Sequence, residues 1–333
     1  GSRIKWDKER LNKIIHTLSQ SDTFVTDDIV VRFRGGRQEQ SFNDYICQQI
    51  ARLKRLGKIR TSETYMAVLR SFSGFMNDKA VLFDQLNADL IAEYEAYLKG
   101  RGNSPNTVSF YMRILKAVYN RAVEDELTEQ RYPFKYVYTG VEKTLKRALS
   151  LNAVRRIKGL DLSLKPNLDY ARDMFLFCFY TRGMSFIDMA YLRKKDLQNG
   201  ILSYRRRKTG QQLFIKWEKC MQDILDKYPV NETEYLLPII TERNEDYRKQ
   251  YANALHRVNH LLKKIGKLLD LPIPLTMYVG RHSWASIAKS RNVPISVISE
   301  GMGHDSESTT QIYLASLDTT VVDKANKKIL DLL

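Results

Sequence analysis

The sequence has little that would support a disulfide framework, a zinc site or a membrane span. Its three cysteines, Cys47, Cys178 and Cys220, lie far apart and form no Cys-x-x-Cys pair. We expect them to be buried thiols in a reducing compartment. No stretch approaches the apolar length of a membrane span, and no secretory segment is expected before the first charged residues. The cytoplasm is therefore the expected compartment.

Negative charge is also scarce relative to positive charge. The chain has 54 Lys and Arg residues against 38 Asp and Glu, a formal net charge of +16. Such an excess indicates a polyanionic partner, and nucleic acid is the first candidate. The length of 333 residues, with 43% hydrophobic residues, is sufficient for two domains. No internal repeat or low-complexity tract interrupts it.

Residues 1–128 have the pattern of a compact helical domain. Helix starts are predicted at Ser41, Thr61, Leu86 and Ser104, where Pro105 suits a first helical turn. Basic residues on these helices indicate a surface for the DNA backbone, with strongly salt-dependent binding. For any one of them, a solvated face is an equally good interpretation. The residues proposed as DNA contacts are Lys54, Arg55, Arg113 and Lys116.

The next two segments are an expected linker, residues 129–146, and a second domain, residues 147–333. Ser150 is predicted to cap the first helix of that domain. The strongest β signal is a pair of runs, 201–204 and 212–215, that flank the turn at 208–210. They predict a hairpin with Lys208 at its tip. The predicted fold class is mainly α, with this small β element in the second domain.

Chemistry-bearing residues gather toward the C-terminus. Gly303-His304 closes one expected helix, and Tyr313 lies nine residues later in the next. Arg281 precedes His304 by 23 residues. Each residue alone has an ordinary interpretation in packing or on the surface. Together, in a basic protein, a tyrosine hydroxyl, a guanidinium and an imidazole suggest attack on a phosphodiester.

The order and spacing of these motifs resemble the tyrosine recombinase (phage-type integrase) family. The motifs are Lys-Thr-Gly at 208–210, Arg-His-Ser at 281–283, Gly-His at 303–304 and Tyr313, with Ser-Pro-Asn-Thr at 104–107. The sequence is most similar to integrases of Bacteroides mobile elements and invertible DNA. The resemblance extends from about residue 25 to nearly the end of the chain. It implies a helical, SAM-like core-binding domain and a mixed, mostly helical catalytic domain with a small sheet.

The resemblance also implies a site-specific recombinase that integrates, excises or inverts a mobile genetic element. Tyr313 would attack the scissile phosphate to form a 3′-phosphotyrosyl link, on the way to a Holliday junction. Arg281 would bind the non-bridging oxygens, His304 would donate a further hydrogen bond, and Lys208 would protonate the leaving 5′-oxygen. No metal or other cofactor is expected, because the arginines take the role of magnesium. On the hairpin, the expected DNA contacts are Arg206 and Arg207.

Two positions depart from the family pattern. Tyr278 stands three residues before Arg281, where a histidine is usual. Because a phenol is not an imidazolium at neutral pH, a phosphate contact is its expected role. Ser185 stands where the first arginine belongs, with Asp188 at the acidic position. Either Arg182, one turn earlier if the segment is helical, supplies that guanidinium, or one arginine fewer is used; the first is favoured.

The expected partner is double-stranded DNA with specific core sites, bound by a homotetramer and gripped between the two domains. The tail at 315–333 would dock on a neighbouring protomer or cap its own domain, with equal support. Residues 1–25 are interpreted as the remnant or linker of an N-terminal arm domain, and a host DNA-bending factor is a further candidate partner. The alternatives are a type IB topoisomerase and a DNA-binding protein without catalysis, which Ser185 and Tyr278 make conceivable. The expected location is the nucleoid in the bacterial cytoplasm.

Overall fold

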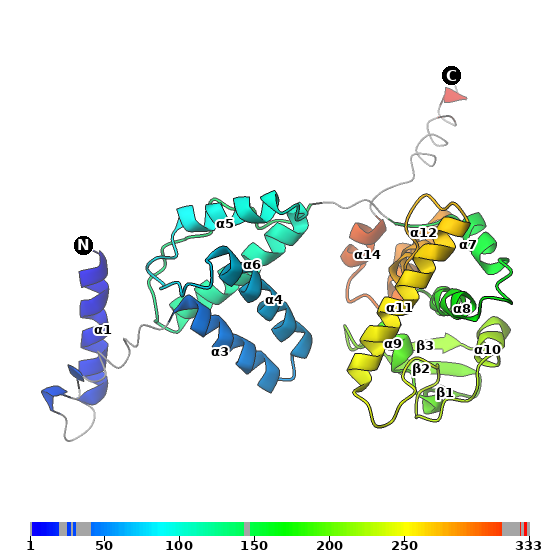
Figure 1. Cartoon of the computed structure of the whole chain (residues 1–333), viewed down its shortest axis with the longest axis horizontal. Helices are drawn as coiled ribbons and strands as arrows, with labels where there is room; N and C mark the ends of the chain where they lie inside the picture. The colour runs from blue at the N-terminus through cyan, green and yellow to red at the C-terminus, as the bar shows by residue number, and fades with distance from the viewer. Residues whose placement is uncertain are drawn as a thin grey trace. The chain divides into compact units, whose positions relative to one another are not determined.

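The computed structural model divides the chain into two units, Gly1–Lys143 and Thr144–Leu333 (Figure 1). The structure describes residues 2–19, 25–27, 29–30, 41–142, 147–314, 327 and 330–331, and of residues 2–7, 10, 312 and 313 it describes only the backbone. Both units are mainly helical, as predicted, and the three-stranded sheet belongs to the second. No helix in these described ranges is long and apolar enough to cross a membrane.

In the first unit, helix α1 (Ser2–Leu18) is followed by four helices that share an apolar core. Side-chain oxygens of Ser41, Asn87 and Ser104 accept hydrogen bonds from backbone N–H groups and so cap three of these helices. The helix starts predicted at Ser41 and Ser104 are confirmed, whereas one helix begins at Ile59, before the predicted Thr61. The four helices are α3 (Phe42–Arg55), α4 (Ile59–Phe75), α5 (Ala88–Gly100) and α6 (Pro105–Glu124).

Aromatic side chains occupy the centre of this first core. Phe72 packs edge-on against Phe42 and Tyr94, with ring centroids 6.0 and 5.1 Å apart, and all three are fully buried. Phe134 and Val137, in the segment expected to be a linker, are buried against the same core. The boundary between the units, after Lys143, falls within the expected linker.

The second unit surrounds helix α8 with further helices and places a small sheet beside them (Figure 1). Ser150 caps its first helix, as predicted. The helices are α7 (Leu151–Lys158), α8 (Pro166–Tyr180), α9 (Phe186–Ala190), α10 (Lys219–Leu225), α11 (Tyr247–Leu268), α12 (Met277–Ser290), α13 (Ile295–Met302) and α14 (Glu307–Leu314), with a 3₁₀ turn η1 (Lys194–Asp196).

The sheet consists of β1 (Leu197–Gln198), β2 (Ile201–Arg205) and β3 (Gln212–Lys216), antiparallel in that order. Tyr204 pairs with Leu213, and alternate residues of β2 and β3 are buried, as expected for a strand that covers a core with one face. The predicted hairpin is confirmed, with Lys208 in the turn between β2 and β3. The short strand β1 was not predicted.

Helix α8 packs against α7, α10, α11 and α12 because its second half is almost wholly apolar. Gly280 lets α12 approach closely, since a Cβ there would lie 3.2 Å from the Cys178 sulfur. At the end of α8, Gly183 has φ +76°, and a Cβ there would lie 2.9 Å from the Cα of Arg281. The turn after α8 is therefore pressed against α12 at Arg281.

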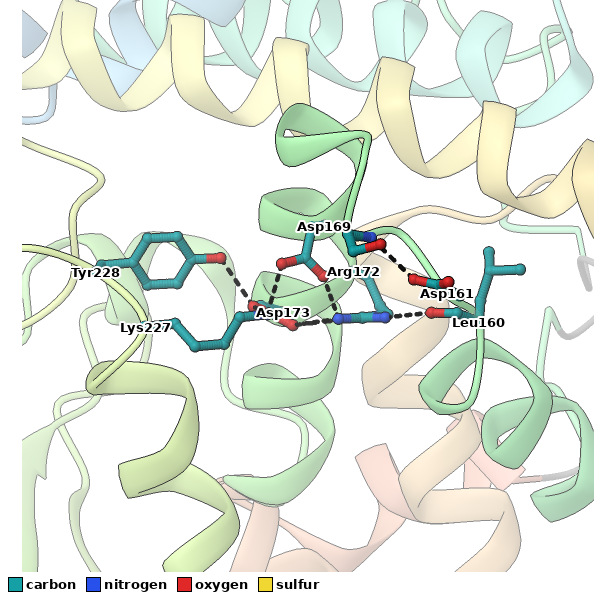
Figure 2. A network of polar contacts seen from close by, with 8 residues as sticks. Leu160, Asp161, Asp169, Arg172, Asp173, Lys227 and Tyr228 are labelled. Carbon is teal, nitrogen blue, oxygen red and sulfur yellow. Dashed lines mark hydrogen bonds and ion pairs between the residues drawn. The ribbon is translucent and has the colours of Figure 1, made fainter.

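A buried network of charges anchors the first half of α8 (Figure 2). Asp173, 2% exposed, accepts hydrogen bonds from the Lys227 ammonium and, at 2.8 Å, from the Tyr228 hydroxyl. Arg172 pairs with Asp169 one turn earlier on the same helix. The network ties α8 to the segment that follows α10, and so fixes the helix that leads to the turn beneath Arg281.

Candidate active site

Arg281 lies on α12 with only 6% of its surface exposed. Its Nη1 donates to the Gly183 carbonyl at 2.6 Å, and its Nη2 donates to the Met302 carbonyl at 2.7 Å. These bonds join the turn after α8 to the end of α13. The guanidinium is held by neutral carbonyls, so its positive charge remains available to an anion.

His304 follows Gly303, which ends α13 in the left-handed conformation with φ 65°. Its Nε2 lies 3.0 Å from the Nη2 of Arg281, and its Nδ1 lies 2.7 Å from the Thr310 hydroxyl. A guanidinium can only donate, so Nε2 accepts and Nδ1 carries the proton. Burial, with the nearby charges of Arg281, Arg206 and Lys208, lowers the pKa of His304 to about 4. His304 is thus neutral at physiological pH.

The β2–β3 hairpin rests on the same glycine turn. The Thr209 hydroxyl donates to the Gly303 carbonyl at 3.3 Å, and the Arg206 guanidinium donates to the same oxygen. Gly303 has a φ of 65°, which favours glycine, and a Cβ there would lie 3.0 Å from the Leu213 side chain, which would have to shift. Lys208 is exposed at the tip, close enough to His304 to influence its pKa.

Arg206, predicted as a DNA contact, is 7% exposed and lies inside the second unit. Its buried Nε has no hydrogen-bond partner among the described residues. Burial lowers the pKa of this guanidinium, and the charge of Arg281 lowers it further. Two cations held near one another in a buried place make binding of an anion there favourable.

Arg182 and Ser185 lie in the turn between α8 and α9. Arg182 has a left-handed φ of 61°, so the segment is not helical at that residue and the one-turn relation to Ser185 does not apply. The Arg182 side chain lies against α13. Its Cδ would be 3.6 Å from a Cβ placed on Gly301 of that helix. Ser185 caps α9, and its hydroxyl donates to the carboxylate of Asp188 at 2.6 Å.

Tyr278 lies one turn before Arg281 on α12 and is 58% exposed. Its ring packs edge-on against His282, with ring centroids 4.3 Å apart. His282 is buried, with 6% of its surface exposed. The phenol of Tyr278 is therefore accessible to a ligand, whereas the imidazole of His282 is largely enclosed.

Tyr313 lies in α14, one residue before its end, and its side chain is outside the described part of the structure. Two contacts of the next residue, Leu314, hold the helix at this point. Leu314 is buried in an apolar cluster with Ile298 and Met302, and its carbonyl accepts a 2.8 Å hydrogen bond from Lys289 of α12. The backbone of α14 at Tyr313 is thus attached to the helix that bears Arg281.

The other predicted DNA contacts are exposed. Lys54 and Arg55 end α3, and Arg113 and Lys116 lie on α6 of the same unit. Arg207 is exposed on the hairpin of the second unit and stacks over the Tyr191 ring at 4.0 Å. Within the described ranges, no group of three His, Cys, Asp or Glu residues could hold a metal ion.

Two residues to which the sequence assigned no chemical role have a place in this site, and one of them, Asp188, stands at the acidic position of the family pattern. Thr310, fully buried, holds the Nδ1 of His304. Asp188, 3% exposed, accepts a 2.9 Å hydrogen bond from the backbone of Arg207. The Ser-x-x-Asp spacing at 185–188, typical of a helix cap, was a signal for Asp188; Thr310 had no such signal.

Two family descriptions match this chain. The phage integrase SAM-like domain matches residues 41–137, and the phage integrase family matches residues 154–320, about half of the chain. The chain therefore belongs to the phage integrase family. It is a tyrosine recombinase, an enzyme of site-specific DNA recombination that breaks and rejoins DNA strands, and the predicted class is confirmed.

Curated relatives and solved structures agree with this assignment. Tyrosine recombinase XerA of Thermococcus kodakarensis is 27% identical over 233 residues, which cover 68% of this chain and 77% of that protein. Tyrosine recombinase XerD of Listeria innocua is 23% identical over 269 residues, covering 76% and 86%.

Among solved structures, a lambda integrase dimer bound to a COC′ core site has a TM-score of 0.65 at 13% identity and covers 92% of this chain and 85% of that one. The Tn1549 transposon integrase in complex with a circular intermediate DNA has a TM-score of 0.62 at 16% identity, covering 87% and 99%. At these identities the likeness establishes a common fold.

Proposed function

We propose that this recombinase cuts double-stranded DNA at specific core sites with Tyr313 as nucleophile and exchanges strands through a Holliday junction. The observation that carries the proposal is the contact of Arg281 with His304, 3.0 Å, beside the helix on which Tyr313 lies. A buried, oriented guanidinium is suited to the charge that develops on a phosphate under attack.

In the proposed step, the Tyr313 oxygen bonds to phosphorus while the bond from phosphorus to the 5′-oxygen breaks. The phenol proton passes to solvent, and the leaving oxygen takes a proton from the Lys208 ammonium. The exposed position of Lys208 at a hairpin tip beside His304 supports this role. Religation reverses the step when the 5′-hydroxyl of a partner strand attacks the phosphotyrosyl bond.

Arg281 binds the non-bridging oxygens in this proposal, and Arg182 supplies the second guanidinium. In support, the Arg182 side chain reaches α13, and no hydrogen bond or ion pair of its guanidinium is found among the described residues. Arg206 is the alternative source, because it is buried beside Arg281 with an unpaired Nε. The exposed phenol of Tyr278 serves as a further phosphate contact.

The DNA backbone is bound by both units in this proposal. Lys54, Arg55, Arg113 and Lys116 serve on the first unit, and Arg207 serves on the second. Their exposure supports the assignment, as does the net charge of +16. Because Arg206 is enclosed, its contribution is to the site around Arg281 rather than to the outer surface.

We further propose that the active assembly is a homotetramer on DNA. A lambda integrase tetramer bound to a Holliday junction shares the fold, with a TM-score of 0.63 at 13% identity. Exchange of the tail at 315–333 between protomers, which falls almost wholly outside the described residues, is part of this proposal. The element served is a Bacteroides-type mobile or invertible DNA in a bacterial nucleoid, with a host DNA-bending factor as an accessory.

A nicked suicide substrate tests the nucleophile. Wild-type protein is expected to form a covalent adduct through the 3′-phosphate, and Tyr313→Phe is expected to form none. Wild-type protein that binds the substrate without an adduct would favour the binding protein without catalysis. Relaxation of supercoiled DNA that lacks a core site would favour the topoisomerase.

A further inference from the structure

A chain of two hydrogen bonds joins Arg281 to helix α14. The first runs from Arg281 Nη2 to His304 Nε2, 3.0 Å, and the second from His304 Nδ1 to Thr310 Oγ1, 2.7 Å. Thr310 is fully buried, and Tyr313 lies three residues further along the same helix. These two hydrogen bonds therefore connect the proposed phosphate-binding group, Arg281, to a residue one helical turn from the proposed nucleophile.

We propose that Thr310 is a positioning residue that holds His304 with its proton on Nδ1 and thereby fixes helix α14, and with it Tyr313, relative to Arg281. The inference deepens the proposed function and rests on Tyr313 being the nucleophile. The hydroxyl oxygen of Thr310 accepts a hydrogen bond from Nδ1–H whether the imidazole is neutral or charged. Only Nε2 can then change its proton, so only Nε2 changes its interaction when a phosphate enters.

Helix α14 packs against α12 and α13, and among its described side chains only Thr310 and Leu314 are buried. It has eight residues, Glu307–Leu314, too short to be stable without tertiary contacts. Its far end is attached through Leu314 to Lys289 and to the apolar cluster with Ile298. At its midpoint, the bond from His304 to Thr310 is the described side-chain hydrogen bond that reaches Arg281 through His304. Without it, Leu314 would be the one buried anchor left among the described side chains of this helix.

Accurate placement of α14 matters because nucleophilic attack needs the reacting atoms in contact and in line. A displacement of about 1 Å at a reacting group can reduce a rate by about a hundredfold. A hydrogen bond that spans the connection between α13 and α14 prevents such a displacement without touching the substrate. Thr310 thus acts through His304 and through its own helix.

The test compares Thr310→Val, which keeps the shape and removes the hydroxyl, with Thr310→Ser, which restores it. Thr309→Val is the matched control, because Thr309 is exposed on the same helix. On the suicide substrate, Thr310→Val is expected to form the adduct about 10- to 100-fold more slowly. Thr310→Ser and Thr309→Val are expected to stay within about threefold of wild type. Wild-type rates in Thr310→Val, or no rescue in Thr310→Ser, would overturn the inference.

A second readout, nuclear magnetic resonance of ¹⁵N-labelled full-length protein, does not depend on cleavage. The His304 Nδ1 proton is expected downfield and protected from exchange in wild type and in Thr310→Ser. It should shift or vanish in Thr310→Val, with assignment by loss in His304→Gln. A His304 proton on Nε2 in wild type would overturn the inference. Absence of any adduct in wild type, with the Nδ1 signal present, would instead refute the proposed function.

Discussion

The backbone N–H of Arg207 donates a 2.9 Å hydrogen bond to a carboxylate oxygen of Asp188. The other oxygen of Asp188 accepts from the Ser185 hydroxyl at 2.6 Å. A carboxylate on α9 thus holds the backbone of Arg207, which immediately precedes Lys208 in the turn of the hairpin. This contact gives the buried acidic residue a role in positioning the proposed general acid.

Replacement of Asp188 by alanine is therefore expected to slow adduct formation about 10- to 100-fold, because the Lys208 turn loses its anchor. Single-turnover cleavage measures the effect. A substrate with sulfur in place of the leaving 5′-oxygen should restore most of the rate, because a thiolate leaves without a proton. The matched control is Asp196→Ala, which removes the carboxylate that caps η1 and should leave the rate unchanged. Equal loss on both substrates would show that Asp188 does not act through Lys208.

The source of the second guanidinium is open to a direct comparison of variants. Arg281→Ala is expected to reduce the cleavage rate about 10²- to 10³-fold, since it removes a preorganised donor to the phosphate. Arg182→Ala should lose a similar factor. Arg193→Ala, which removes an exposed arginine paired with Glu234, is the control and should cleave normally. The role would belong to Arg206 if Arg182→Ala cleaved at the wild-type rate while Arg281→Ala and Arg206→Ala both cleaved more slowly.

Local signals explain why much of this fold could be predicted from the sequence. Ser104 with Pro105 and Ser150 both cap helices, because their side chains act on the backbone a few residues away. The hairpin around Lys208 and the turn at Gly303 depend in the same way on nearby residues.

Contacts between distant segments were the part that sequence could not supply. The burial of Arg206 follows from the packing of its hairpin on Gly303, 97 residues away. Arg182 adopts a left-handed conformation that a non-glycine residue rarely has, because the turn beside it is pressed against Arg281. The hydrogen bond between His304 and Thr310 spans only six residues, but it depends on the angle between α13 and α14, which no residue pattern specifies.

The lowered pKa of His304 predicts a loss of stability on mild acidification. The pKa is about 4 in the folded protein and about 6.5 in an unfolded chain, so the unfolded state gains its proton first. The stabilising contribution is complete above about pH 6.5 and is lost as pH falls toward 4. Because the ring is partly exposed, the contribution is discounted to about 1 kcal/mol.

Urea unfolding at about pH 7.5 and about pH 5 measures this contribution. Wild type should lose about 1 kcal/mol more than His304→Gln between the two conditions, because glutamine has no proton to gain. His256→Gln, which replaces an exposed histidine, is the control and should lose as much as wild type. An identical loss in wild type and His304→Gln would contradict a lowered His304 pKa.

The charge network on α8 in Figure 2 predicts a stability effect. Asp173→Ala leaves Lys227 and the Tyr228 hydroxyl without their shared acceptor. The expected cost is about 3 kcal/mol, the lower part of the range for breaking a buried pair, because the Lys227 side chain is 39% exposed. Asp223→Ala breaks the exposed pair with Lys219 and should cost less than about 1 kcal/mol. Urea unfolding measures both, and equal costs would show that the network contributes no more than a surface pair.

If the exposed cations of the first unit contact DNA phosphates, removing one should change how DNA affinity depends on salt concentration. Lys54→Ala, Arg55→Ala, Arg113→Ala and Lys116→Ala each remove a proposed phosphate contact. Each is expected to lower the slope of log affinity against log salt by about one, because one fewer counterion is released from the DNA. Lys99→Ala is the control, since Lys99 is already paired with Glu95 at 2.8 Å on α5.

Fluorescence anisotropy with a duplex that contains the core site, at several salt concentrations, gives these slopes. A companion duplex without the core site separates backbone contacts from base contacts. A residue that contacts phosphate weakens binding to both duplexes by about the same factor, since the phosphates are the same in each. If the four variants kept the wild-type slope, these side chains would be a solvated face, and the DNA surface would lie elsewhere on the protein. Loss on the core-site duplex alone would instead indicate that the residue reads base edges.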